Sequence, residues 1–141
     1  TKYLNRISGP LLDRIDLHVE VTPVAFSALS SPVTTENSAS IRDRVMAART
    51  IQAKRYKCKK GIYANAQIGS KEMKEICQLN EAGQALLKNA MEKLSLSARA
   101  YDRILKVART VADLANSENI MPEHIAEAIH YRSLDREGWG G

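Results

Sequence analysis

Two arginines stand in sequence contexts that set them apart from the other cations of the chain. Pro10 is a residue that opens helices, so Arg14 is predicted to project from the end of a short helix just before an extended segment. Arg99 falls in the first turn of another predicted helix, where the helix dipole disfavours a cation by about 0.3–1 kcal/mol. An arginine kept at the position of Arg99 suits an anionic partner. The plainer alternatives are pairing of Arg14 with Asp13 or Asp16 and a solvated helix face for Arg99.

The positive charge of the chain is concentrated in one stretch. The net charge is +5, yet residues 41–60 carry +7 and the other 121 residues carry −2. The cations of this stretch are Arg42, Arg44, Arg49, Lys54, Arg55, Lys57, Lys59 and Lys60, against the single anion Asp43. A local block of this kind is typical of a docking surface, and a solvated helix face is the alternative.

Patterns for independent catalysis are missing from the sequence. None of the seven glycines has the spacing of a phosphate loop or of a dinucleotide-binding loop. Glu127 and His130 form a single Glu-x-x-His pair, whereas a di-metal helical site needs such pairs on two helices, so we expect no metal site. Cys58 and Cys77 match no zinc or disulfide pattern and are expected to be reduced thiols. We therefore expect no enzymatic activity from this chain alone.

Composition places the chain among globular proteins. Its 141 residues are 44% hydrophobic and 26% charged, which suits one domain or a piece of a larger one. No apolar run approaches the roughly 18 residues of a membrane helix, and no signal peptide is evident. The expected location is cytoplasmic, with no membrane partner.

The first 40 residues contain a possible strand and a connector. Apolar and polar residues alternate over residues 16–22, which predicts a half-buried strand. No second strand of comparable clarity follows, so this strand must either pair with residues outside the chain or fray. Residues 25–40 are rich in serine and threonine and are predicted to be a flexible linker.

The rest of the chain has helical periodicity. Helices are predicted over residues 41–57, from Ser70, from Asn80, from Ser95 or Ser97 to about residue 116, and from Pro122. In the strongest of them the apolar stripe consists of Tyr101, Ile104, Leu105, Ala108, Val111, Ala112 and Ala115. The expected fold class is mainly α: a small helical bundle with an N-terminal helix–strand appendage.

Two blocks of sequence resemble a known family. Residues 3–21, which include Ser-Gly-Pro-Leu-Leu-Asp-Arg-Ile-Asp-Leu, resemble the end of the ATPase core in magnesium-chelatase-like AAA+ ATPases of the ComM/YifB type. Residues 96–114, which begin Leu-Ser-Ala-Arg-Ala-Tyr-Asp-Arg, resemble the lid of that family, as do residues 125–136. The blocks span nearly the whole chain in the family's order.

The resemblance implies a C-terminal fragment of a hexameric ATPase. Residues 1–24 would be the edge of the core, poorly ordered alone, 25–40 a linker, and 41–141 the helical lid with a preceding basic helix. The phosphate loop and Mg²⁺-binding motif would lie upstream, so ATP and Mg²⁺ belong to the parent protein. Arg14 would be the arginine finger and Arg99 the sensor-2 arginine. Arg6 is an alternative finger, and whether Arg99 acts in cis or in trans stays open.

The resemblance also suggests what the parent protein does. Its partners would be neighbouring subunits of a homo-oligomeric ring and the upstream AAA+ core, and its role DNA remodelling in competence or branch migration. Cations Arg49, Lys54, Arg55, Lys57, Lys59 and Lys60 would then contact DNA, through the phosphates because aromatic residues are only 5%. The alternatives are docking of this block on a neighbouring subunit, a porphyrin magnesium chelatase subunit, and a free-standing helical DNA- or protein-binding module.

Overall fold

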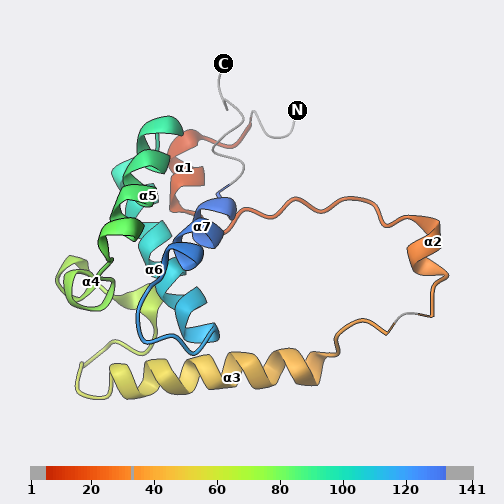
Figure 1. Cartoon of the computed structure of the whole chain (residues 1–141), viewed down its shortest axis with the longest axis horizontal. Coiled ribbons are helices and arrows are strands. Elements are labelled where there is room, and N and C mark those ends of the chain that lie inside the picture. Colours follow the sequence, from red (N-terminus) through yellow and green to blue (C-terminus); the bar gives the residue numbers. More distant parts are fainter. Residues whose placement is uncertain (1–5, 33, 133–141) are drawn as a thin grey trace.

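The computed structural model describes residues 6–32 and 34–132. A cluster of helices packs along one side of a single long helix (Figure 1). The elements are α1 (Gly9–Arg14), α2 (Phe26–Leu29), α3 (Ser38–Arg55), the 3₁₀ turn η2 (Asn65–Gln67), α4 (Ser70–Ile76), α5 (Glu81–Lys93), α6 (Ala98–Leu114) and α7 (Pro122–His130). The expected fold class, a small helical bundle, is confirmed. In the described ranges no helix has both the length and the apolarity needed to cross a membrane.

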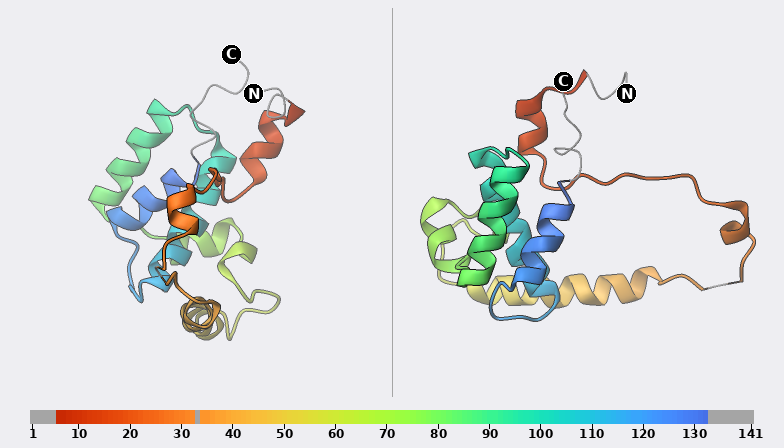
Figure 2. Two further views of the ribbon diagram at one scale, coloured as in Figure 1. Left: turned by 90° about the vertical axis from the view of Figure 1, so that its right-hand side faces the viewer. Right: turned by 45° about the horizontal axis from the view of Figure 1, so that its top comes forward.

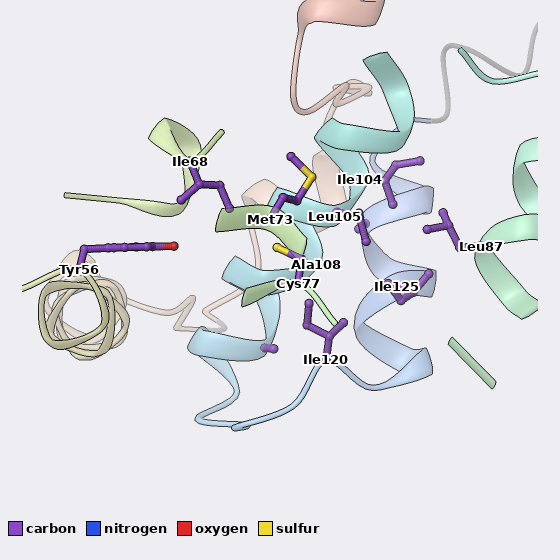
Figure 3. Close-up of a cluster of buried hydrophobic side chains, with 12 residues drawn as sticks. Tyr56, Ile68, Met73, Cys77, Leu87, Ile104, Leu105, Ala108, Ile120 and Ile125 are labelled. Atoms are coloured by element: carbon purple, nitrogen blue, oxygen red, sulfur yellow. The ribbon is translucent and has the colours of Figure 1, made fainter. Parts of the chain in front are cut away.

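Helix α6 forms the centre of the hydrophobic core. It packs against α1, α3, α4 and α7, and its side chains meet those of the loops at Ile68 and Ile120 (Figure 3). The predicted stripe is confirmed for Ile104, Leu105, Ala108 and Ala112, which are buried. The stripe is wrong at its two ends, Tyr101 and Ala115, which are exposed: each lines an open hollow between α6 and the neighbouring helices.

Helix caps agree with two of the three predictions. The Asn80 side chain accepts a hydrogen bond from the backbone of Gly83 at 2.8 Å, and that of Ser97 accepts one from Ala100 at 3.2 Å. Ser70 does not cap α4, since the residue at that position is Gly69. The backbone N–H of Gly69 donates to the Glu72 carboxylate at 3.0 Å, and this hydrogen bond takes the place of a serine cap.

The predicted strand over residues 16–22 is not formed. In this segment the backbone N–H of His18 donates to the carbonyl of Tyr131 at 2.7 Å. The apolar residues Leu17, Val19 and Val21 are exposed. Figures 1 and 2 show this segment leaving the bundle toward α2 and returning to α3. The described ranges offer no neighbouring strand, so the alternating pattern has nothing to pair with.

Helix α3 touches the bundle along its second half only. Ala48 and Gln52 are buried, whereas Ile41 and Val45, which precede Ala48 at helical spacing, are exposed. In Figure 1 the N-terminal part of α3 extends past the bundle. The C-terminal part, which carries Arg49, Lys54 and Arg55 and leads into Lys57, Lys59 and Lys60, is therefore the fixed part.

Candidate functional site

Arg14 is the last residue of α1. The helix begins at a Ser8 cap, whose hydroxyl accepts from the Leu11 N–H at 3.3 Å, and Pro10 lies in its first turn. Leu12 is buried and Arg14 is exposed. Within the described residues Arg14 has no hydrogen bond or ion pair, so the alternative pairing with Asp13 or Asp16 is not observed. Its guanidinium is available to an anion.

Arg99 is the second residue of α6 and is likewise exposed. The structure gives it no ion pair or hydrogen bond to any described side chain. Arg103, one turn later, instead pairs with Asp16 at 3.0 Å. Arg103 therefore joins α6 to the segment that follows α1, whereas Arg99 has no partner among the described residues.

The two helices that carry these arginines pack on each other. Contacts between α1 and α6 place Gly9, Leu12 and Asp13 across a small hollow from the loop of residues 94–97, which leads into Arg99. The structure therefore brings the two predicted phosphate-contacting arginines onto adjacent helices.

Arg132 holds α1 in place, and the sequence analysis did not single it out. Its side chain is about 1% exposed and donates to the backbone oxygens of Ile15, at 2.7 Å, and Leu12, at 3.2 Å. These carbonyls lie at the end of α1, where a helix leaves its last carbonyls without internal partners. A cation at a helix C-terminus also interacts favourably with the helix dipole. Arg132 thus ties the Arg14 helix to the end of α7.

Replacing Arg132 with alanine is expected to loosen α1 from the bundle. Hydrogen bonds to charged groups contribute about 1.5–3 kcal/mol each, and two are lost here. Hydrogen exchange at the Leu12 and Ile15 amides should speed up at least tenfold, while amides in the middle of α6 keep their protection. Arg103→Ala, which removes a partly exposed ion pair, is the control and should change these rates little. Equal effects of the two variants would contradict the role given to Arg132.

A buried polar network joins α3 to α6, and its centre is Asp113. The carboxylate accepts hydrogen bonds from both terminal nitrogens of Arg55, at 2.6 and 2.8 Å, and from Asn65 at 2.9 Å, and it forms an ion pair with Arg109 at 3.2 Å. Asn65 in turn accepts from the hydroxyl of Tyr56 at 2.6 Å. The network fixes the C-terminal end of α3 on the core.

Electrostatics in this network favour the ionised carboxylate. Burial opposes the charge on Asp113, but the hydrogen bonds from Arg55 and Asn65, with the charges of Arg55 and Arg109, outweigh it and hold the pKa of Asp113 below its ordinary value. The bond to Asp113 raises the pKa of Arg55. This pair is a structural ion pair and remains charged across the physiological range.

The basic block divides into paired and unpaired cations. Arg55 is used by the network, Lys59 pairs with Glu75 at 3.4 Å, and Arg44 pairs with Glu36. In residues 6–32 and 34–132 no ion pair or hydrogen bond engages the side chains of Arg42, Arg49, Lys54, Lys57 or Lys60, all of which are exposed. Only the second group is free to meet an external anion.

The two cysteines occupy different environments. Cys77 is buried in the core, and that burial raises the pKa of its thiol to about 11. It is therefore a neutral core side chain at physiological pH. Cys58 is exposed beside the basic block.

Comparison with known proteins assigns the chain to a family. The family model described as "Magnesium chelatase, subunit ChlI C-terminal" matches residues 35–132, and the model "Magnesium chelatase, subunit ChlI" matches residues 1–29. The chain belongs to the magnesium-chelatase ChlI family. Arg14 falls in the segment matched by the second model, and Arg99 in the segment matched by the C-terminal one.

Relatives within the magnesium-chelatase-like proteins are of the ComM/YifB type. Competence protein ComM of Haemophilus influenzae and the uncharacterized protein YifB of Escherichia coli are each 43% identical to this chain over 96% of its length. An uncharacterized protein of Mycobacterium tuberculosis is 33% identical over 93%. The chain covers 26% of the length of each of these relatives.

Proposed function

We propose that this chain is the lid portion of a magnesium-chelatase-like AAA+ ATPase and contributes two arginines to ATP hydrolysis. Arg14 is the arginine finger and Arg99 the sensor-2 arginine. The observation that carries the proposal is that both guanidinium groups are exposed and lack partners in the described residues, on adjacent packed helices. Phosphoryl transfer spreads negative charge over oxygens, and a planar, permanently charged guanidinium stabilises that charge.

The proposal requires an oligomeric ring. A finger arginine at the end of α1 acts on nucleotide bound by the neighbouring subunit, so the active form is a ring of identical subunits, which we take to be a hexamer. ATP and Mg²⁺ are held by the upstream core, by resemblance to the family. Exposed arginines without protein partners fit a triphosphate ligand. Within the lid, α6 carries Arg99, and Arg132, just after the end of α7, holds α1, so lid position and finger position are linked.

The parent protein is proposed to act on DNA. One 43% identical relative is named a competence protein, and competence is the uptake of external DNA. Magnesium insertion into a porphyrin is the second candidate, supported by the description of the family models. A free-standing helical module is supported less well, because the two family models match successive parts of this one chain.

Replacing Arg99 with alanine in the full-length ATPase tests the sensor-2 assignment. Loss of one charge-assisted contact to phosphate, worth about 1.5–3 kcal/mol, should lower ATP affinity or hydrolysis roughly ten- to a hundredfold. Steady-state ATPase kinetics and binding of a fluorescent ATP analogue measure the two effects. Arg103→Ala, on the same helix, is the matched control and should keep ATP affinity. An unchanged rate and affinity in Arg99→Ala would contradict the assignment.

A further inference from the structure

A basic hollow lies where α3 ends and the next loop begins. We call it the α3 hollow; it is lined by Met46, Arg49, Thr50, Ala53, Tyr56, Lys57, Cys58, Lys59, Lys60, Gly61, Ile62 and Tyr63. Its lining contains four cations and no carboxylate. In Figure 1 this end of α3 turns back toward the bundle through a loop at the edge of the molecule.

The loop that forms the hollow is anchored at both ends. Tyr56 is buried in the core cluster, and Ile62 packs against that cluster from the other side of the loop. The backbone N–H of Tyr63 donates to the Gln67 side chain at 2.8 Å. Lys57 and Lys60 therefore sit on a supported turn, and Gly61, with a φ of +82°, provides the left-handed residue that this turn requires.

Tyr63 is the unusual member of the hollow. About 75% of its surface is exposed, whereas Tyr56, at the other end of the same loop, is buried. An exposed aromatic ring beside cations is the combination by which proteins bind single-stranded nucleic acid: the cations follow the phosphates and the ring stacks on a base. The low aromatic content led us to expect phosphate contacts alone, and Tyr63 is the residue that changes this expectation.

We propose that the α3 hollow binds single-stranded DNA, with Arg49, Lys57 and Lys60 on successive phosphates and one base stacked on Tyr63. This deepens the DNA-related part of the proposed function and does not depend on the roles of Arg14 and Arg99. A duplex fits less well, because its bases are stacked on each other and present no free face to Tyr63. The negative end of the α3 dipole opposes a phosphate here, but the three cations of the hollow that are unpaired within the described residues, Arg49, Lys57 and Lys60, outweigh its roughly half charge.

Removing two cations of the hollow tests the proposal on this chain. Lys57→Ala combined with Lys60→Ala is compared with Lys88→Ala combined with Lys93→Ala, which removes the same charge from exposed sites on α5. Binding of a labelled oligothymidylate is followed by fluorescence anisotropy over a range of salt concentrations. The hollow variant should bind at least tenfold more weakly and lose about 1.4 from the slope of log affinity against log salt, since each single-strand phosphate contact contributes about 0.7. The α5 variant should keep the parent slope. Equal losses in both variants would overturn the proposal.

Tyr63 separates single-strand recognition from general attraction to phosphate. Tyr63→Ala should weaken binding of the oligothymidylate about fivefold or more and leave duplex binding unchanged, while Tyr63→Phe keeps parent affinity because the ring is retained. Equal weakening for duplex and single strand, or no weakening for either, would overturn the stacking role and with it the proposal.

Cys58 allows the contact to be observed at the hollow itself. Its thiol is exposed and lines the hollow, whereas Cys77 is buried, so an environment-sensitive dye can be attached selectively. The dye signal should change with the same midpoint as the anisotropy. DNA binding without any change at Cys58 would place the site elsewhere and reject the hollow alone. No DNA binding by this chain would also reject the hollow, and no DNA-dependent ATPase activity of the full-length protein would reject its proposed role on DNA.

Discussion

Replacing Arg14 with alanine in the full-length ATPase is expected to lower ATP hydrolysis by about 10³-fold or more, with little change in ATP affinity. The finger arginine interacts with charge that develops as the phosphoryl group is transferred, so its loss affects the rate more than ground-state binding. Arg14 suits this role because it ends α1, is exposed and has no partner in the described residues. Steady-state hydrolysis and equilibrium ATP binding, measured on the same preparation, separate the two effects.

Three further variants sharpen this test. Arg14→Lys should remain strongly impaired, because a lysine lacks the planar fork of donors. Arg6→Ala addresses the other candidate, and loss of hydrolysis there with retention in Arg14→Ala would move the finger to Arg6. Mixing Arg14→Ala subunits with subunits that carry an inactivated phosphate loop should restore some activity, because a ring then contains interfaces with one intact phosphate loop and one intact Arg14. No restoration would contradict action across the interface.

Local sequence signals predicted the elements that carry both arginines. Pro10 predicted the start of α1, and Ser95 or Ser97 the start of α6; the structure adds the Ser8 cap and decides for Ser97, and each cap depends on atoms within three residues. The stripe of α6 was readable because four of its apolar residues recur with the period of one helix face. Where the structure departs from such signals, as at Tyr101, the reason is how closely α4 and α5 approach α6, and no local pattern reports this.

The contacts that position the site could not be read from the sequence. Arg132 donates to a backbone oxygen 117 residues away, and Arg55 donates to a carboxylate 58 residues away. Residue type and spacing mark neither acceptor. The acceptor of Arg132 is a main-chain carbonyl, and the acceptor of Arg55 is one carboxylate among 16 acidic residues. Arg55 shows the consequence: charge density placed it with the candidate DNA contacts, whereas the fold gives its guanidinium to Asp113.

Replacing Asp113 with alanine is expected to lower the free energy of unfolding of this chain by about 3–5 kcal/mol, the range for breaking one side of a buried ion pair. The side chain of Asp113 has no exposed surface, and its removal leaves Arg55, Arg109 and Asn65 without their shared acceptor. Urea unfolding followed by circular dichroism measures the loss. Asp102→Ala removes an exposed carboxylate from the same helix and should change stability by less than about 0.5 kcal/mol.

The pH dependence of unfolding tests the charge of the Asp113 carboxylate separately from the loss of unfolding free energy in Asp113→Ala. Because the pKa of Asp113 in the folded chain lies below the ordinary value of 3.8, its contribution is complete above about pH 5 and is lost as the pH falls through the lowered value. The parent chain should lose stability over this acidic window more steeply than Asp113→Asn, which keeps the shape of the side chain and has no charge to lose. Asp102→Ala should follow the parent curve. Two results would contradict this role: Asp113→Asn that follows the parent curve, or Asp113→Ala that costs less than about 1 kcal/mol. In either case the charges of the network do not hold α3 on the core. The end of α3 that forms the α3 hollow is then held by the packing of Tyr56 and Ile62.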